Sequence, residues 1–463
     1  MLTKTRRENT SNLPITGKTS PSDNDVAARF GLRWLWQTIW ESRRQHAVVL
    51  STIVTSFIEF GLRTVHSILI ARILGPVGRG EYATVVFYMQ SLAYAGLLGS
   101  HYAITRHAAR HPDDAATLRP TATRVAMLTG FGSFVVVAML SLLILPMDKR
   151  FLVPLCIICG LTLPSEHMRI LLLSVDQGCR DFFQHNANRI FAAVVFPALI
   201  LLVWALGIGT VAVITTMTVI VPLLALVFRS VTTRQRLFVG PAKPSTRQII
   251  KQGLPYSFAE LSGTLFDRLH IFLVLCLASL TMQGYYTAAL PVSSLLMVAP
   301  FALTMFTFNS GADPKRPVTL RDVWLVGGGV LLFQGVTTVI LLSILQPLII
   351  ILLGSDFAPS IQLARVLIVA TAIAGCGQIA EGYLRGRRKS SLGIWARCFG
   401  AVTLLIFVAF AYGPLGTDCI PIAALIGYLA STSWIMAAVI HDVHTQTSQA
   451  SIGMSTAARE DDR

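Results

Sequence analysis

The stretch that decides the fold runs from Ile190 to Phe228 and reads IFAAVVFPALILLVWALGIGTVAVITTMTVIVPLLALVF. No residue in it is charged. A helix needs about 20 apolar residues to cross the hydrocarbon core of a bilayer, so this stretch is long enough for two crossings. We therefore predict two transmembrane helices, at 189–207 and 210–229.

The rest of the chain repeats this pattern. Of its 463 residues, 53% are hydrophobic and 13% are charged, whereas soluble proteins carry about 25% charged residues. The mean hydropathy is +0.63. We predict an all-α polytopic membrane protein of about twelve transmembrane helices, at 46–71, 82–104, 122–145, 151–175, 189–207, 210–229, 254–279, 284–308, 322–345, 360–384, 391–412 and 418–440. The short apolar segment Pro347–Gly354 either continues the ninth helix or forms an interfacial turn. The glycines Gly327–Gly329 are expected to permit close helix contact.

The basic residues orient these helices. A net charge of +15 is compatible with nucleic-acid binding, but the basic residues lie in short connectors between apolar blocks. With the N-terminus inside, the inside segments hold 29 of the 38 Lys and Arg residues, and the outside loops hold four. Cytoplasmic loops are enriched in Lys and Arg. We therefore predict a multi-pass inner-membrane protein with both termini in the cytoplasm and no nucleic-acid partner.

The two sets of six predicted helices resemble each other. Gly80 opens a short motif after the first helix, and Gly284 opens a similar one after the seventh, 204 residues later. The spacing of 11 residues between Gly178 and Arg189 recurs between Gly386 and Arg397, 208 residues later. The matching places predict two parallel six-helix repeats, which would permit alternating access by rocking of one bundle against the other.

Five segments follow from these patterns. We predict a cytoplasmic tail at 1–45, a six-helix bundle at 46–229, a cytoplasmic linker at 230–253, a second six-helix bundle at 254–440 and a cytoplasmic tail at 441–463. Within the first tail, residues 28–44 place Leu32, Leu35 and Trp36 on one helical face. This pattern is typical of an interfacial amphipathic helix, although a simple lead-in to the first span would also explain it.

The sequence ARILGPVGRGEYA at Ala71–Ala83 resembles the first outer loop of bacterial polysaccharide (O-antigen-type) flippases. Their superfamily also holds multidrug extruders and the lipid II flippase. The resemblance covers about residues 46–440, and further matching stretches are Gln177-Gly178, Asn188-Arg189, Phe266-Asp267-Arg268 and Leu353-Gly354-Ser355-Asp356-Phe357. It implies that the protein flips undecaprenyl-pyrophosphate-linked oligosaccharide across the membrane for surface or exopolysaccharide synthesis. It also implies polysaccharide polymerase and export proteins as partners.

Charged residues inside the predicted helices are the candidate site residues. A charge at the bilayer centre costs about 2.5–3.5 kcal/mol on insertion scales, so each requires a reason. Arginine suits a pyrophosphate cargo because its planar fork binds phosphate oxygens bidentately. The candidates for substrate binding are Arg63, Arg268, Arg397 and Arg365.

Carboxylates inside the helices are candidates for coupling to H⁺ or Na⁺. They are Glu59, Glu260 and Asp267. A purely structural role is the alternative for each of them. Glu59, for example, can pair with Arg63 at a spacing of four residues. Glu166 and Arg169 are expected to pair in the same manner, and His270 either relays protons or forms ordinary hydrogen bonds.

The sequence carries no nucleotide-binding P-loop and no metalloprotease or serine-hydrolase motif. We therefore predict a transporter that has no catalytic residues, no cofactor and no metal site, and whose direct partners are its substrate and membrane lipids. An ion-coupled multidrug extruder of the same superfamily is one alternative. A polytopic glycan polymerase or glycosyltransferase is another, but such enzymes need a large outer loop, and every predicted outer loop is short.

Overall fold

A computed structural model describes residues 43–233, 244–312 and 318–461. These residues contain helices and connecting turns and no strand. Residues 53–463 form one compact unit, to which the following description applies. The predicted amphipathic helix falls almost entirely outside the described residues, so it stays a prediction.

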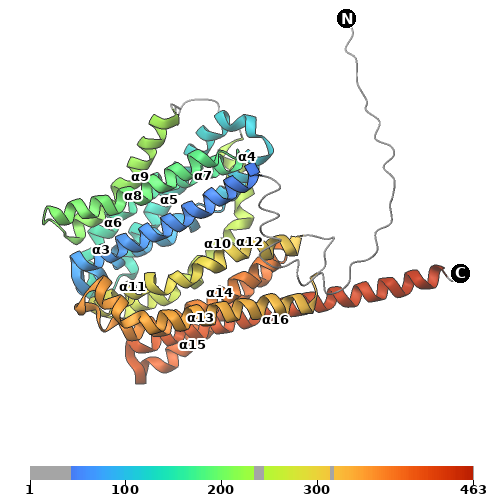
Figure 1. The fold of residues 1–463 in the computed structure, drawn as a ribbon. Coiled ribbons are helices and arrows are strands. Elements are labelled where there is room, and N and C mark those ends of the chain that lie inside the picture. The colour runs from blue at the N-terminus through green and yellow to red at the C-terminus, as the bar shows by residue number, and fades with distance from the viewer. Residues whose placement is uncertain (1–42, 234–243, 313–317, 462–463) are drawn as a thin grey trace, which may run out of the picture. The chain divides into compact units, whose positions relative to one another are not determined.

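The helices of the first half correspond to the first six predicted spans (Figure 1). They are α3 (Arg43–Ala95), α4 (Ser100–Arg110), α5 (Ala115–Ile144), α6 (Val153–Gly160), α7 (Thr162–Gly178), α8 (Phe182–Ala205) and α9 (Val211–Thr233), with 3-10 turns at η1 (Pro112–Asp114) and η2 (Met147–Leu152). Helix α3 contains the first span and most of the second, separated by Gly75 at φ 64°. Helices α4 and α5 both pack on α7.

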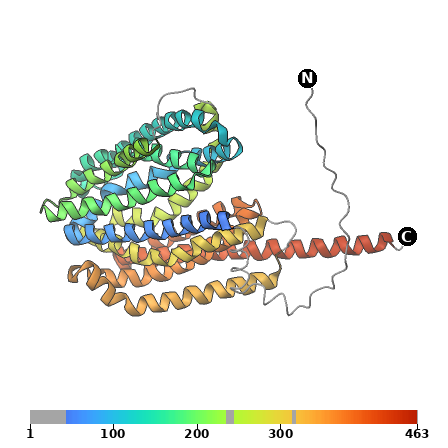
Figure 2. The same ribbon diagram turned by 45° about the horizontal axis from the view of Figure 1, so that its top comes forward.

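The helices of the second half correspond to spans seven to twelve. They are α10 (Thr246–Leu277), α11 (Leu280–Ser294), α12 (Val298–Ala312), α13 (Leu320–Leu353), α14 (Ser360–Gly386), α15 (Ser390–Leu415) and α16 (Cys419–Asp461), with 3-10 turns at η3 (Leu295–Met297), η4 (Ser355–Phe357) and η5 (Gly416–Asp418). The orange and red helices α14, α15 and α16 lie side by side in Figures 1 and 2, and each packs on the other two.

The predicted number of membrane crossings agrees with this architecture. By length and composition, eight stretches of the described residues could cross a membrane, and one of them, Ser390–Gln446, contains both α15 and α16. The remaining predicted spans fall in the two parts of α3 and in α10, which carries Glu260, Asp267 and Arg268. The chain is thus an all-α multi-pass membrane protein with about twelve transmembrane helices in two six-helix repeats.

The two repeats touch through equivalent positions. A Cβ on Gly80 would lie 1.9 Å from the Leu280 carbonyl oxygen and 3.1 Å from the Gly284 amide nitrogen. A Cβ on Gly284 would lie 1.8 Å from the Pro76 carbonyl oxygen. Only glycine permits this approach, because any larger residue would press on backbone atoms. The motifs that predicted the repeat therefore meet each other in the fold.

Each repeat also contributes one residue to the hydrophobic core of the other. Ala71 of α3 is fully buried in a core formed mainly by α10–α16. Leu275 of α10 is fully buried in a core formed mainly by α3–α9. The two residues are 204 positions apart, which is the repeat offset, so each half contributes the same position to the core of the other.

The structure can be compared with three predictions about individual segments. Pro347–Gly354 continues the ninth span, because α13 runs to Leu353. The helix α16 extends through most of the predicted tail, and α9 and α10 extend into both ends of the predicted linker. The prediction for Gly327–Gly329 is wrong, since a Cβ on any of the three would have no atom within 4 Å.

Candidate functional site

The first cluster of ionisable residues joins α3, α7 and α8. Glu59 accepts hydrogen bonds from Arg63 Nη2 at 2.5 Å and from Arg189 Nη2 at 2.6 Å. Glu166 accepts two hydrogen bonds from Arg169, at 2.8 Å and 2.6 Å. Arg63 lies within electrostatic range of Glu166. Three guanidinium groups thus accompany two carboxylates, so this cluster has a net positive charge.

Arg63 is the accessible cation of this cluster. Its side chain is 61% exposed, whereas that of Arg189 is 19% exposed. Glu59 is held by both arginines, so the Arg63 guanidinium can release it and leave the carboxylate paired. The geometry therefore permits Arg63 to bind an anion without leaving a buried charge unpaired.

The second cluster joins α14 and α15 and centres on Glu381, which is 6% exposed. Arg397 Nη2 donates to both carboxylate oxygens, at 2.8 Å and 2.7 Å. Arg385 donates to Glu381 Oε1 at 2.8 Å and 3.0 Å. The candidate Arg397 is therefore held in place by a carboxylate that sequence reasoning did not identify.

Asp267 and Arg268 lie beside this cluster on α10 and point in different directions. Adjacent helical residues are about 100° apart, so the two cannot share one face. Arg268 Nη1 lies 3.4 Å from Gln90 Oε1 on α3. Arg397 acts on Asp267 electrostatically, but within the described part of the chain the Asp267 carboxylate has no hydrogen-bonded or ion-paired partner. The Asp267 carboxylate is thus unpaired among the described residues, although two guanidinium groups, those of Arg397 and Arg268, lie within electrostatic range of it.

The repeat relates only one arginine of each cluster. At the junction of the fourth and fifth spans of each half, the offset of 208 residues takes Arg189 to Arg397. In the first span the offset is 204 residues, which takes Glu59 to Gly263 and Arg63 to Asp267. Arg189 pairs with Glu59 on α3, whereas Arg397 pairs with Glu381 on α14. The carboxylate that pairs with this arginine therefore comes from a different position in each half.

Comparison with known families identifies the chain. Residues 47–307, more than half of its length, match the family model described as a polysaccharide biosynthesis protein. The chain belongs to the polysaccharide biosynthesis protein family. The matched region contains the whole first cluster together with Asp267 and Arg268. No curated protein matches this member of the family in sequence.

Solved structures show the same fold. The lipid II flippase MurJ in its inward closed conformation aligns with a TM-score of 0.68 at 11% identity, over 85% of this chain and 89% of MurJ. An inward-facing multidrug resistance MATE family transporter of the MOP superfamily aligns with a TM-score of 0.64 at 15% identity, over 83% and 95%. The Vibrio cholerae MATE transporter VcmN aligns with a TM-score of 0.61 at 14% identity, over 87% and 99%. This family member thus shares its fold with these proteins.

The other predicted site residues lie outside the two clusters. Arg365 is in the first turns of α14, where Nη1 donates to Gln362 Oε1 at 3.2 Å. Glu260 accepts a hydrogen bond from Tyr102 at 3.2 Å. His270 is buried and contacts the hydroxyls of Tyr286 at 2.7 Å and Tyr428 at 3.5 Å, which agrees with ordinary hydrogen bonding. Among the described residues, no group of three His, Cys, Asp or Glu side chains could hold a metal ion.

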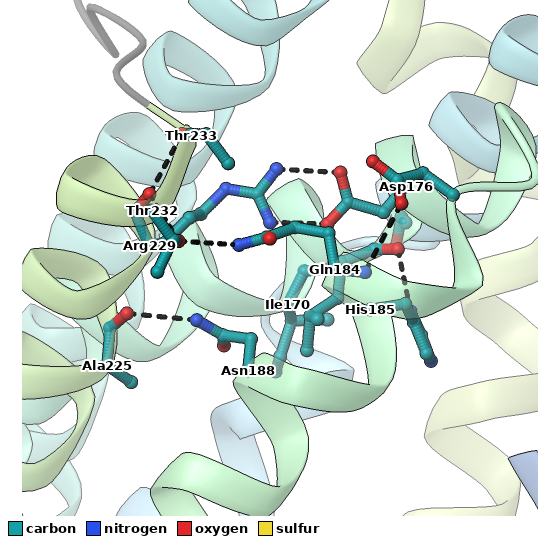
Figure 3. A network of polar contacts seen from close by, with 12 residues as sticks. Ile170, Asp176, Gln184, His185, Asn188, Ala225, Arg229, Thr232 and Thr233 are labelled. Carbon is teal, nitrogen blue, oxygen red and sulfur yellow. Dashed lines mark hydrogen bonds and ion pairs between the residues drawn. The ribbon is translucent and has the colours of Figure 1, made fainter. Parts of the chain in front are cut away.

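Among the described residues, the most deeply buried ion pair is one that the sequence did not predict (Figure 3). Asp176 of α7 and Arg229 of α9 have side chains that are 0% and 2% exposed. Arg229 donates through Nη2 to Asp176 Oδ1 at 2.7 Å and through Nη1 to the other oxygen. Gln184 and Asn188 of α8 bond to Thr232 and to the Ala225 carbonyl of α9 beside this pair. This network fixes the ends of three helices to one another.

The second half has a related connection with reversed charges. Asp442 of α16 pairs with Lys389 at 2.5 Å and with Arg387 at 3.3 Å, and accepts a hydrogen bond from Tyr383 at 3.1 Å. In each half, an ion pair therefore joins the region around the end of the fourth span to the end of the sixth.

Three of the four predicted outside cations contact the opposite repeat. Arg72 donates to the carbonyls of Leu352, at 2.7 Å, and Ile351 at the end of α13. Lys149 is buried and donates to the carbonyls of Leu275 and Ala278, both at 2.6 Å, at the end of α10. Arg79 donates to the Thr287 carbonyl at 3.2 Å. Cations stabilise helix C-termini. Arg72 and Lys149 therefore stabilise the contact between the two repeats at the end of the molecule that holds the predicted outside loops.

Proposed function

We propose that this protein flips undecaprenyl-pyrophosphate-linked oligosaccharide repeat units across the bacterial inner membrane by alternating access. In this proposal both termini lie in the cytoplasm, as the distribution of Lys and Arg predicts. The product would be supplied to surface or exopolysaccharide synthesis. A polysaccharide polymerase and export proteins would act on it next.

The observation that carries this proposal is the surplus of guanidinium groups in the first cluster. A lipid-linked pyrophosphate is anionic, and three arginines facing two glutamates leave one cation uncompensated. Arg63, the exposed member, would contact the pyrophosphate. Arg268 would contact it from the second repeat, because among the described residues its side chain has no ion-pair partner. Arg397 would contribute its charge from the position where Glu381 holds it.

Ion coupling belongs to the same proposal. Asp267 would bind H⁺ or Na⁺, because its carboxylate is unpaired among the described residues and lies beside the second cluster. Glu59 and Glu260 would follow as secondary sites, because both already accept hydrogen bonds. Arg365 is not part of the proposed site, because it lies outside both clusters.

An ion-coupled multidrug extruder is the second candidate function. The free carboxylate of Asp267 and the similarity of the fold to MATE transporters favour it. The cationic surplus in the first cluster disfavours it, because a cationic drug would be repelled there.

Complementation in the host organism tests the proposal. The gene is deleted, and wild type or the variants Arg63→Ala, Arg268→Ala and Arg365→Ala are expressed at matched levels. Surface polysaccharide and intracellular lipid-linked repeat units are then quantified. We expect the deletion to lose polymer and to accumulate repeat units, and we expect only wild type and Arg365→Ala to restore the polymer.

The other outcomes are equally informative. Full rescue by Arg63→Ala and Arg268→Ala would retain a flippase and exclude the proposed site. A deletion strain with normal polysaccharide and altered drug sensitivity would replace the flippase with the extruder.

A further inference from the structure

A cavity outside the arginine clusters lies between α4, α7 and α10. Its volume is about 330 Å³, which falls at the lower end of the range of roughly 300–1,000 Å³ for small-molecule sites. The residues that define it here are His101, Tyr102, Thr105, Arg106, Gln177 and Tyr256. We refer to it as the aromatic pocket. None of these residues has a part in the function proposed above.

Three aromatic rings form one side of this pocket. The ring centroids of His101 and Tyr102 are 4.0 Å apart, and those of Tyr102 and Tyr256 are 5.5 Å apart. Tyr102 is 45% exposed and Tyr256 is 38% exposed. An aromatic face carries partial negative charge, and the C–H groups on one face of a sugar ring carry partial positive charge. Exposed, adjacent tyrosines therefore provide a surface on which a sugar ring can stack.

Polar groups surround the aromatic surface. Arg106 Nη1 lies 3.4 Å from the Tyr256 hydroxyl, which leaves the other guanidinium donors available. The side chain of Gln177 is exposed at the edge of the pocket. These donors and acceptors suit the hydroxyl groups of a sugar, while Arg106 disfavours a cationic drug.

The position of the pocket suits a cargo that contacts both repeats. Tyr102 and Arg106 belong to the first repeat, and Tyr256 belongs to the second. Tyr102 also donates to Glu260, a residue of the second repeat. The pocket contains Arg106, which follows the predicted span at 82–104. It therefore lies at the end of the molecule that the positive-inside rule assigns to the cytoplasm. Lipid-linked repeat units present their sugars on that side before transport.

We propose that the aromatic pocket binds a sugar ring of the lipid-linked oligosaccharide while the pyrophosphate occupies the first and second clusters. This inference rests on the proposed flippase function and adds a sugar-binding subsite to it. Tyr102 and Tyr256 stack on the ring, and Arg106 and Gln177 bond to its hydroxyl groups.

Binding to the purified full chain in nanodiscs tests this proposal. The probes are farnesyl pyrophosphate and the same compound carrying one glucose, galactose or N-acetylglucosamine. The proteins are wild type, Tyr256→Ala, Tyr256→Phe and the matched control Tyr412→Ala, which removes another exposed tyrosine. We expect wild type to bind at least one sugar-bearing probe about three- to tenfold more tightly than farnesyl pyrophosphate.

The variants should then separate the sugar from the pyrophosphate. We expect Tyr256→Ala to lose this preference and to bind farnesyl pyrophosphate as wild type does, which also shows that it is folded. Tyr256→Phe and Tyr412→Ala should keep the preference.

Each other outcome overturns the inference at a different level. A preference that survives in Tyr256→Ala places the sugar elsewhere. Equal binding of every probe by wild type leaves the flippase proposal intact and removes the subsite. Failure of wild type to bind any probe overturns the flippase proposal and the subsite together.

Discussion

Replacement of Arg229 by glutamine should strongly destabilise the first repeat. The substitution leaves Asp176 with a side chain that is 0% exposed and without its bidentate partner. Breaking a buried ion pair by removing one partner costs roughly 3–5 kcal/mol. Arg119 stays within electrostatic range of Asp176 and offsets part of the loss. We therefore expect the lower end of that range, about 3 kcal/mol.

The free energy of unfolding can be measured by SDS titration in mixed micelles, with helicity followed by circular dichroism. Lys389→Gln is the matched control, because that lysine is 47% exposed and Asp442 keeps Arg387 and Tyr383. It should cost less than about 1 kcal/mol. If Arg229→Gln costs no more than the control, the assignment of a stabilising buried pair is wrong.

A double-mutant cycle provides a second check. Asp176→Asn alone should be destabilising, and the double variant Asp176→Asn/Arg229→Gln should be more stable than the sum of the two single effects predicts. Strict additivity would mean that the two side chains do not interact, whatever each contributes alone.

Two further predictions concern the contact between the repeats. Gly284→Ala must move the Pro76 carbonyl oxygen away from its 1.8 Å distance to the new Cβ, so it should cost about 1–3 kcal/mol in the same SDS titration; Gly328→Ala, where the added Cβ meets no atom within 4 Å, should cost nothing measurable. Lys149→Met should cost about 1–3 kcal/mol, because it leaves two carbonyls at the end of α10 without their donor, and a melting profile identical to wild type would show that this contact does not hold the repeats together.

Much of the fold follows from local sequence properties. The length of the apolar stretches determines the number of crossings, and the repeat is detectable because Gly80 and Gly284 occupy a contact that tolerates no side chain. The pair of Glu166 and Arg169 is also predictable, because helix geometry alone brings residues three positions apart together.

The candidate site depends on contacts that sequence spacing does not specify. The partner of Arg397 is Glu381 on a neighbouring helix, and their spacing of 16 residues has no relation to the helical period. Arg229 is the last residue of a predicted span, where an arginine is expected to face the headgroups, but its side chain turns inward to Asp176. A carboxylate near the end of a predicted span, such as Asp176 or Glu381, was the available signal for both contacts.

The backbone contact of Gly80 with Gly284 also determines how the repeats can turn. Residues related by a twofold operation can touch only on the axis that relates them, so this contact marks the pseudo-twofold axis at one end of the molecule. A rotation of about 10° about that point would displace the far end of a 30 Å transmembrane helix by about 5 Å. That distance is about half the diameter of a helix. A small angular change close to the glycines would therefore become a wide opening at the opposite face of the membrane.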